Sequence, residues 1–202
     1  MKKRSIISVI ILLIIGINSV NAQTIWGVRL GLSYYMEKAK IEDPSASFTY
    51  NFDVNFLGIE FGPVMYYSFT NRVYLNSGAT LGVIFPLEDE MRDENQLFHL
   101  DIPLYLGLNA PISNSLSLFA QAGSYVGYWI ATNELTNDIL NPLQAGLGLM
   151  AGLNIRRFKF EIGYKYGLTN LTSFEGGIRD GIYLMKSSSK LSTLFLGINL
   201  VF

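Results

Sequence analysis

The last nine residues of the 202-residue chain constrain its fold more than any other segment. From Leu194 to Phe202 the even positions carry Leu, Leu, Ile, Leu and Phe, whereas the odd positions carry Phe, Gly, Asn and Val. An apolar face that repeats at every second residue is typical of a β-strand with two different surroundings. The strand also ends on an aromatic residue. With an export signal at the other end of the chain, it predicts a closed β-barrel in an outer membrane.

The first 22 residues are expected to be a cleaved signal peptide. Three basic residues at positions 2–4 precede an apolar stretch at 6–17, and short side chains follow at 20–22, where a signal peptidase cleaves. The apolar stretch is too short for a membrane-spanning helix. The remaining residues, 23–202, are expected to form one outer-membrane β-barrel domain.

The composition separates a barrel from other classes of protein. Half of the residues are apolar and 15% are charged, against about 25% charged in ordinary soluble domains. Membrane helices are disfavoured, because the uncharged stretch 102–133 contains Pro103 and Pro111, and evenly spaced glycines interrupt 139–155. The chain has no cysteine, which excludes disulfides, thiolate metal sites and a lipid anchor on cysteine.

Alternation of apolar and polar residues predicts eight strands. They are expected at residues 25–36, 56–68, 72–85, 97–109, 116–130, 143–155, 157–167 and 191–202. The connections between them alternate between short (69–71, 110–115 and 156) and long (37–55, 86–96, 131–142 and 168–190). Bacterial outer-membrane barrels have short periplasmic turns and longer outer loops. The predicted fold is therefore an all-β, eight-stranded, antiparallel, transmembrane up-and-down β-barrel. It has four longer outer loops, three short periplasmic turns and both termini in the periplasm of a Gram-negative bacterium.

Charged residues inside these strands fall on the face opposite the large apolar side chains. In one strand Phe98, Leu100 and Ile102 share one face, and His99 and Asp101 share the other. A soluble barrel would show the reverse arrangement, and a lipid-facing Arg or Lys costs about 2–4 kcal/mol at mid-bilayer. The predicted lumen charge network comprises Arg29, Glu60, His99, Asp101, Lys159, Glu161 and Lys165. Its three Lys and Arg side chains are expected to pair with its three carboxylates and close the lumen, since buried charges need partners. The alternative is a polar path for ions.

Outward aromatic residues cluster at two heights on the predicted strands. Trp26, Tyr67, Phe158 and Phe202 lie near the periplasmic ends, and Tyr34, Phe85, Phe98, Tyr128 and Tyr166 lie near the outer ends. Two girdles of such rings are expected at the membrane interfaces. The alternative is that aromatic residues simply favour strands. Most glycines fall on the inner face, which makes room for large inward side chains in a barrel of this size.

One strand carries a resemblance to a known family. The run from His99 to Gly107, with Ile102-Pro103-Leu104 at its centre, resembles the "IPL" strand of the Bacteroidota outer-membrane β-barrel family, often called PorT-like. The segments 27–33 and 196–202 fit the same family. The resemblance implies an eight-stranded barrel whose terminal aromatic strand, ending at Phe202, is read by the barrel-assembly machinery. It implies no single activity, although the namesake is linked to secretion and gliding. Because proline lacks a backbone donor, Pro103 is expected to need a bulge or bend.

Catalytic and metal-binding interpretations have little support in the sequence. His99 and Asp101 could orient a general base, but no inward serine is tied to them by spacing, so an interior hydrogen-bonded histidine is expected and no enzyme is predicted. The acidic run 88–94 could take Ca²⁺ or Mg²⁺ through carboxylate oxygens. It lacks the glycine and the spacing of an EF-hand loop, so a solvated loop and no dedicated metal site are expected. No cofactor is predicted, and no basic stripe indicates nucleic-acid binding.

Two classes of function remain open. The first is a structural or interaction protein of the outer membrane that acts at the cell surface or with a secretion or envelope partner. Its expected partners are outer-membrane lipid, lipopolysaccharide, the barrel-assembly machinery and an unidentified envelope protein. The second is a small passive conduit or binding barrel for ions or small apolar molecules; a hydrolase is the least supported. A filled lumen favours the first class and a water-filled lumen the second.

Overall fold

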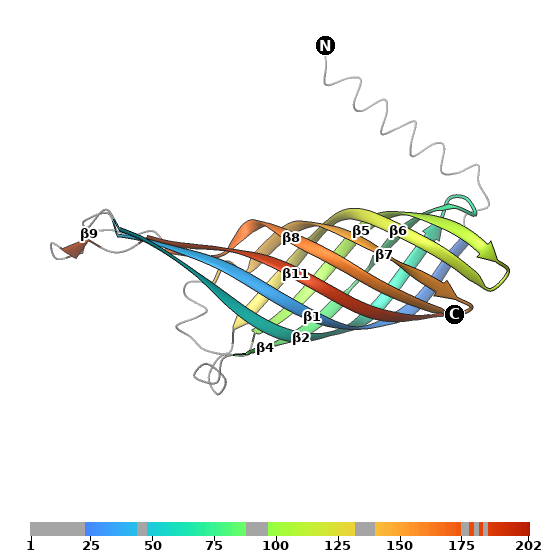
Figure 1. Cartoon of the computed structure of the whole chain (residues 1–202), viewed down its shortest axis with the longest axis horizontal. Helices are drawn as coiled ribbons and strands as arrows, with labels where there is room; N and C mark the ends of the chain where they lie inside the picture. Colours follow the sequence, from blue (N-terminus) through green and yellow to red (C-terminus); the bar gives the residue numbers. More distant parts are fainter. Residues whose placement is uncertain are drawn as a thin grey trace, which may run out of the picture.

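The computed structural model describes residues 23–43, 48–87, 97–131, 140–174, 178–179, 182–183 and 186–202. Antiparallel strands dominate this part of the chain (Figure 1). They are β1 (Gln23–Asp43), β2 (Phe48–Ser68), β3 (Val73–Gly78), β4 (Thr80–Pro86), β5 (Leu97–Ser113), β6 (Leu116–Ala131), β7 (Leu143–Ile155), β8 (Phe158–Phe174), β9 (Ile178–Arg179), β10 (Ile182–Tyr183) and β11 (Lys186–Val201). The predicted signal peptide, residues 1–22, and the acidic run 88–94 lie outside the described residues.

The strands close into a ring. β1 pairs antiparallel with β2 on one side and with β11 on the other, and each remaining wall strand pairs with the strands that precede and follow it. β3 and β4 follow one another between β2 and β5, so they share one position in the wall. Where the ring is closed, every strand is paired on both sides; toward the loop end β2 before Phe56 has a ladder partner only in β1. The prediction of an all-β antiparallel barrel is confirmed.

The break between β3 and β4 lies between two prolines. Pro63 of β2 flanks Ala79 on one side and accepts a hydrogen bond from its backbone nitrogen (3.1 Å). On the other side, Ser77 pairs with Leu104 and Thr80 with Asp101, which leaves Pro103 facing the interruption. Neither proline can donate a backbone hydrogen bond. The irregularity expected at Pro103 is therefore found in the neighbouring strand.

Two of the predicted loops are wrong. β1 and β2 pair continuously as far as Asp43 and Phe48, so most of the predicted loop 37–55 is strand. β8 and β11 likewise extend into the predicted loop 168–190. In Figure 1, β1, β2 and β11 reach beyond the other strands. We call this end of the barrel the loop end. The predicted turn 110–115 is also shorter than expected, because β5 continues to Ser113.

The opposite end carries the short connections and the carboxyl terminus, and we call it the turn end (Figure 1). Its turns span residues 69–72, 114–115 and 156–157. Arg156 has a positive φ of 55°, the left-handed conformation that a two-residue hairpin turn requires. A tight turn at this position fixes the register of β7 against β8.

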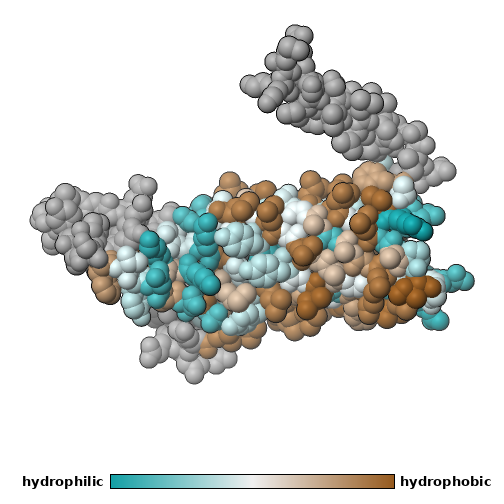
Figure 2. Space-filling view, turned by 45° about the horizontal axis from the view of Figure 1, so that its top comes forward, coloured by the Kyte–Doolittle hydropathy of each residue, from teal (hydrophilic) through white to brown (hydrophobic). Residues whose placement is uncertain are grey.

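The outside of the wall is apolar between the two ends. Large side chains such as Leu30, Leu104 and Leu196 are each more than half exposed. Figure 2 shows a broad hydrophobic surface on the middle of the barrel between more hydrophilic ends. An exposed apolar surface this large is not stable in water and suits contact with lipid. No helix in the described part of the chain is long and apolar enough to cross a membrane.

Candidate functional site: a layered lumen and its two mouths

The first charged layer of the lumen is centred on Lys165. Its ammonium nitrogen lies 3.2 Å from Oε2 of Glu60 and 3.2 Å from Oδ2 of Asp101. Glu60 also accepts hydrogen bonds from the hydroxyls of Ser33 (2.5 Å) and Tyr35 (2.7 Å). All of these side chains are buried. One ammonium group thus bridges two carboxylates, and the hydroxyls satisfy lone pairs that burial would otherwise leave unpaired.

His99 belongs to the same layer. Its Nδ1 lies 3.4 Å from Oδ1 of Asp101, and its Nε2 lies 2.9 Å from the hydroxyl of Tyr35. The ring stacks on Trp129, with 4.9 Å between centroids. Among the described residues, no serine hydroxyl forms a hydrogen bond with His99, and the imidazole is only 3% exposed. The ring therefore lies within the layer, away from any substrate in solution.

The second charged layer joins three strands nearer the turn end. Nε of Arg29, on β1, lies 2.9 Å from Oε1 of Glu161 on β8. The same nitrogen donates a hydrogen bond to Oδ1 of Asn199 on β11 (3.1 Å). The guanidinium carbon lies 5.6 Å from the ring centre of Phe195. Arg29 and Glu161 are both about 2% exposed, so this ion pair is shielded from water.

Lys159 does not form the expected ion pair. Among the described residues, no carboxylate lies within 4 Å of its nitrogen. That nitrogen lies instead over the rings of Phe119 (3.8 Å), Tyr66 (4.2 Å) and Tyr74 (4.3 Å), and it donates a hydrogen bond to the Tyr74 hydroxyl (2.9 Å). Cation–π contacts with three rings replace a carboxylate partner. The prediction failed because strand parity shows which face a charge occupies but not which acid it meets across the lumen.

Apolar layers separate the charged ones. Val64, Tyr66 and Tyr74 pack together at the turn end, and Tyr105, Met150 and Phe195 pack together in the middle. The largest cluster closes the loop end and comprises Tyr35, Val54, Phe56, Ile84, Leu97, Trp129, Ala131, Leu140, Leu171 and Leu191. Side chains therefore fill the lumen in alternating apolar and charged layers.

Two glycines show why small residues occupy the inner face. A Cβ atom at Gly31 would overlap the Phe195 ring, and one at Gly82 would overlap the imidazole of His99. Each glycine leaves space that a large side chain from a neighbouring strand fills. The many inward glycines therefore allow large side chains to fill the lumen.

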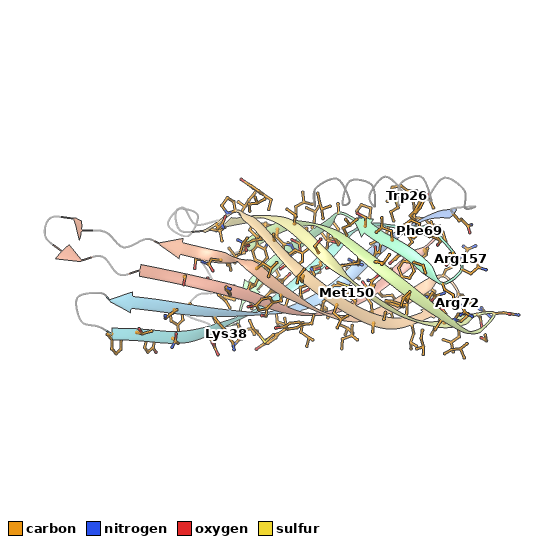
Figure 3. All side chains as sticks on the ribbon, turned by 90° about the horizontal axis from the view of Figure 1, so that it is seen from above. Trp26, Lys38, Phe69, Arg72, Met150 and Arg157 are labelled. Atoms are coloured by element: carbon orange, nitrogen blue, oxygen red, sulfur yellow. The ribbon has the colours of Figure 1, made fainter. Side chains whose placement is uncertain are left out.

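The aromatic residues assigned to the interfaces lie at the two ends of the apolar wall. Trp26, Phe158 and Phe202 are exposed at the turn end, and Tyr67 is partly buried and meets Phe69 edge-on. At the opposite end of the wall Phe85, Phe98, Tyr128 and Tyr166 are exposed, and Tyr34 is partly buried. Figure 3 shows Trp26, Phe69, Arg72 and Arg157 together at the turn end. Contact of these rings with lipid headgroups stays a prediction.

Three aromatic side chains at the loop end were missed by the sequence analysis. Phe48, Tyr50 and Phe52 form a stacked row along β2, with ring centroids 6.5 and 6.0 Å apart. Phe52 packs against the apolar cluster at the loop end, whereas Phe48 and Tyr50 are more than half exposed. They continue the alternation of Val54 and Phe56, and this unbroken alternation could have identified them.

A pocket of about 210 Å³ lies at the turn end. Its lining includes the cage of Lys159 (Tyr66 and Tyr74) together with Arg156 and Arg157 from the last turn. The pocket is thus basic and partly aromatic, and it stops at the layer that contains Lys159. In the described part of the chain, no three His, Asp or Glu side chains group closely enough to hold a metal ion.

Comparison with known proteins identifies the family. The family described as "Outer membrane protein beta-barrel domain" matches residues 10–173. The chain belongs to this family. It is an outer-membrane β-barrel protein, and the general part of the predicted resemblance is confirmed. No curated protein matches the chain.

Two solved structures resemble the whole barrel. The outer membrane protein OprG from Pseudomonas aeruginosa is 12% identical, with a TM-score of 0.51; the match covers 91% of this chain and 98% of OprG. The outer membrane protein AlkL, solved in DMPC lipid bilayers, is 13% identical, with a TM-score of 0.51; that match covers 89% of this chain and 90% of AlkL. At such low identities the likeness shows the fold alone.

Proposed function

We propose that this protein is a closed barrel of the outer membrane that acts through its surfaces, as a structural or interaction protein of the cell envelope. Residues 1–22 export it, both termini lie in the periplasm, and the loop end faces the outside. This orientation places the short turns in the periplasm, as in other bacterial barrels. A PorT-like role beside a secretion or envelope partner is one form of this proposal.

The observation that carries the proposal is the layer formed by Lys165, Glu60 and Asp101 beneath the apolar cluster at the loop end. An open pore needs a continuous column of water between the two mouths. Here an ammonium group and two carboxylates, on side chains at most 6% exposed, meet across the lumen. Tyr35 and Trp129 pack directly above them. A column of water would have to separate these groups.

The loop end offers the surface for an interaction. β1, β2, β8 and β11 extend furthest there, and β2 presents the row Phe48, Tyr50 and Phe52. At the other end, Phe202 donates its backbone nitrogen to the carbonyl of Trp26 (2.9 Å), which completes the pairing of the last strand with the first. We assign Phe202 to assembly by the barrel-assembly machinery. No catalytic role is assigned, because His99 and Asp101 are enclosed.

The second candidate is a binding barrel for small apolar molecules. It is favoured by the aromatic row of β2, which leads from the loop end to the apolar cluster inside the wall. One variant distinguishes the two candidate functions. For a binding barrel, Tyr50→Ser weakens binding of an apolar fluorescent probe to the purified protein. For a closed interaction protein, the variant leaves probe binding unchanged.

Conductance tests the closed lumen. The purified protein, reconstituted in planar bilayers, is expected to give little steady conductance. A porin with a water-filled channel, measured in the same bilayers, serves as the positive control. A large, reproducible channel in the unmodified protein would contradict the proposal and favour a conduit.

A further inference from the structure

The outside of the wall carries a second pocket, near the loop end. It has a volume of about 270 Å³ and is formed by neighbouring strands β1, β11 and β8. Lysines line it from two strands, Lys38 and Lys40 from β1 and Lys190 from β11. Figure 3 labels Lys38 on the part of β1 that extends toward the loop end. This pocket lies on the opposite side of the wall from the lumen.

A double irregularity in strand pairing creates the hollow. β11 pairs with β8 through Ser188–Ser173, Lys190–Asn170 and Ser192–Tyr166. From one of these pairs to the next, β11 moves by two residues each time, whereas β8 moves by three residues and then by four. Extra residues on one strand form bulges, which bend the strand and interrupt the ladder. The regular ladder is interrupted twice here, and Lys190 lies between the two register shifts.

The charges around the hollow are unusual. Lys38 and Lys190 are paired directly in the register of β1 and β11, and both side chains are exposed. Like charges directly opposite one another are destabilising. Asp53 pairs with Lys38 from β2, on the side away from the pocket, and no ion pair joins them in the described structure. None of the described residues that line the pocket is acidic. A bound anion would relieve this repulsion.

The position of the pocket relative to the lipid headgroups indicates which kind of anion it would bind. The outward side chains of β1 include Leu30, Leu32, Tyr34 and Met36 below the pocket, and Lys38 and Lys40 beside it. Lys38 lies four residues beyond Tyr34, about 13 Å along the strand at ~3.3 Å per residue. Interfacial tyrosines mark the level of the lipid headgroups. The lysines therefore lie beside or just above the headgroups, where lipid phosphates are found.

Neutral donors complete the pocket. Ser188 and Ser192 of β11 and Asn170 and Tyr166 of β8 line it together with the lysines. Their hydroxyl and amide groups can donate hydrogen bonds to phosphate oxygens, and ammonium groups bind phosphate through charge-assisted hydrogen bonds. Carboxylates, which would repel an anion, are absent from the described lining.

We propose that this pocket binds the phosphate of a phosphorylated glycolipid in the outer leaflet, of the lipopolysaccharide type. The choice of leaflet rests on the proposed orientation, with the loop end outside. The chemistry of the pocket does not depend on it. Binding would fix the barrel at a defined height and rotation against one lipid.

The test uses the full mature barrel in zwitterionic detergent micelles, where orientation plays no part. Native mass spectrometry of a titration with phosphorylated lipid A gives an apparent Kd. The double variant Lys38→Gln, Lys190→Gln should weaken binding about 30-fold, since each lysine near an anionic surface contributes roughly fivefold. The matched control is Arg72→Gln, Arg157→Gln, which makes the same change in charge at the turn end and should leave the Kd unchanged. Heat-modifiable migration on SDS gels verifies that each variant is folded.

Two further binding measurements distinguish the phosphate of lipid A from free inorganic phosphate. Lipid A from which the phosphates have been removed should bind the unmodified protein as weakly as intact lipid A binds the double lysine variant. Inorganic phosphate should displace lipid A only at concentrations far above that of the lipid. The proposal is overturned if both double variants lose binding equally, if removal of the phosphates has no effect, or if inorganic phosphate competes at equal concentration. None of these results would contradict the proposal of a closed barrel, because the conductance experiment tests that proposal separately.

Discussion

The wall of this barrel has opposite polarity in two regions of the same strands. Between the ends of the barrel, β1 presents Leu30 and Leu32 to the outside and Arg29 and Ser33 to the lumen. Toward the loop end, β1 presents Lys38 and Lys40 to the outside, and Ala39 turns inward between them.

The same reversal occurs along β2. Leu57 and Ile59 face outward with Glu60 inside, and further along Asp53 faces outward with Phe52 on the inner face. The surroundings of the outer face account for the change. Lipid excludes charge from the outer face of the lower region, whereas water around the upper region favours charged residues outside and apolar residues inside. The reversal therefore marks the height at which the wall leaves the membrane.

The largest effect is expected from Lys165→Ala in the lower region. Removal of the ammonium group leaves Glu60 and Asp101 buried without their shared partner, and breaking a buried pair in this way costs about 3–5 kcal/mol. Urea unfolding in lipid vesicles, followed by tryptophan fluorescence, measures the loss. Lys190→Ala makes the same substitution in the upper region and should cost less than about 0.5 kcal/mol. Equal losses would mean that Lys165 is accessible to water.

A smaller effect is expected when charge is added to the outside of the wall. Leu196→Arg places a guanidinium on the outer face of the lower region and should cost about 2–4 kcal/mol. Thr49→Arg places the same group on the outer face of the upper region, at the residue that pairs with Glu42 of β1, and should be neutral. The heat-modifiable fraction in outer membranes and urea unfolding measure both. A neutral Leu196→Arg would show that this height of the wall does not contact lipid.

The smallest effect is expected for the other buried lysine. Lys159→Met removes an ammonium group that pairs with no carboxylate among the described residues, so no buried anion is left without a partner. Methionine also fills the space between Tyr66, Tyr74 and Phe119. The free energy of unfolding should change by about 1 kcal/mol or less, since buried charges can often be replaced by apolar side chains at little cost. A loss as large as that of Lys165→Ala would show that Lys159 has an acidic partner.

The sequence revealed the lower region far better than the upper one. Alternation placed Leu30, Leu196 and Leu104 on the outer face and Glu60 and Asp101 on the inner face, because lipid imposes one rule on every strand. The rule reverses near Lys38. Charged residues on the outside and aromatic residues on the inside were therefore read as a loop over 37–55, although the strands continue there.

The site shows the same limit. Parity showed that Arg29, Lys159 and Lys165 share the lumen with the acids, but it could not show which cation meets which acid. That choice depends on register across several strands. Arg29, Asn199 and Lys159 lie side by side in one row, and Arg29 pairs with Glu161. The outer pocket was invisible for a related reason, because its bulges arise from the pairing of β8 with β11 and from no local motif.

Cysteine labelling of intact cells tests the reversal of polarity most directly. The chain has no cysteine, so single substitutions give no background. Lys190→Cys and Leu196→Cys place thiols six residues apart on the outer face of β11. With a membrane-impermeant maleimide, position 190 should be labelled in intact cells, and position 196 only after the membrane is dissolved in SDS. Equal labelling of both positions in intact cells would contradict a wall that leaves the membrane between them. Labelling at 190 only in permeabilised cells would contradict a loop end outside the cell.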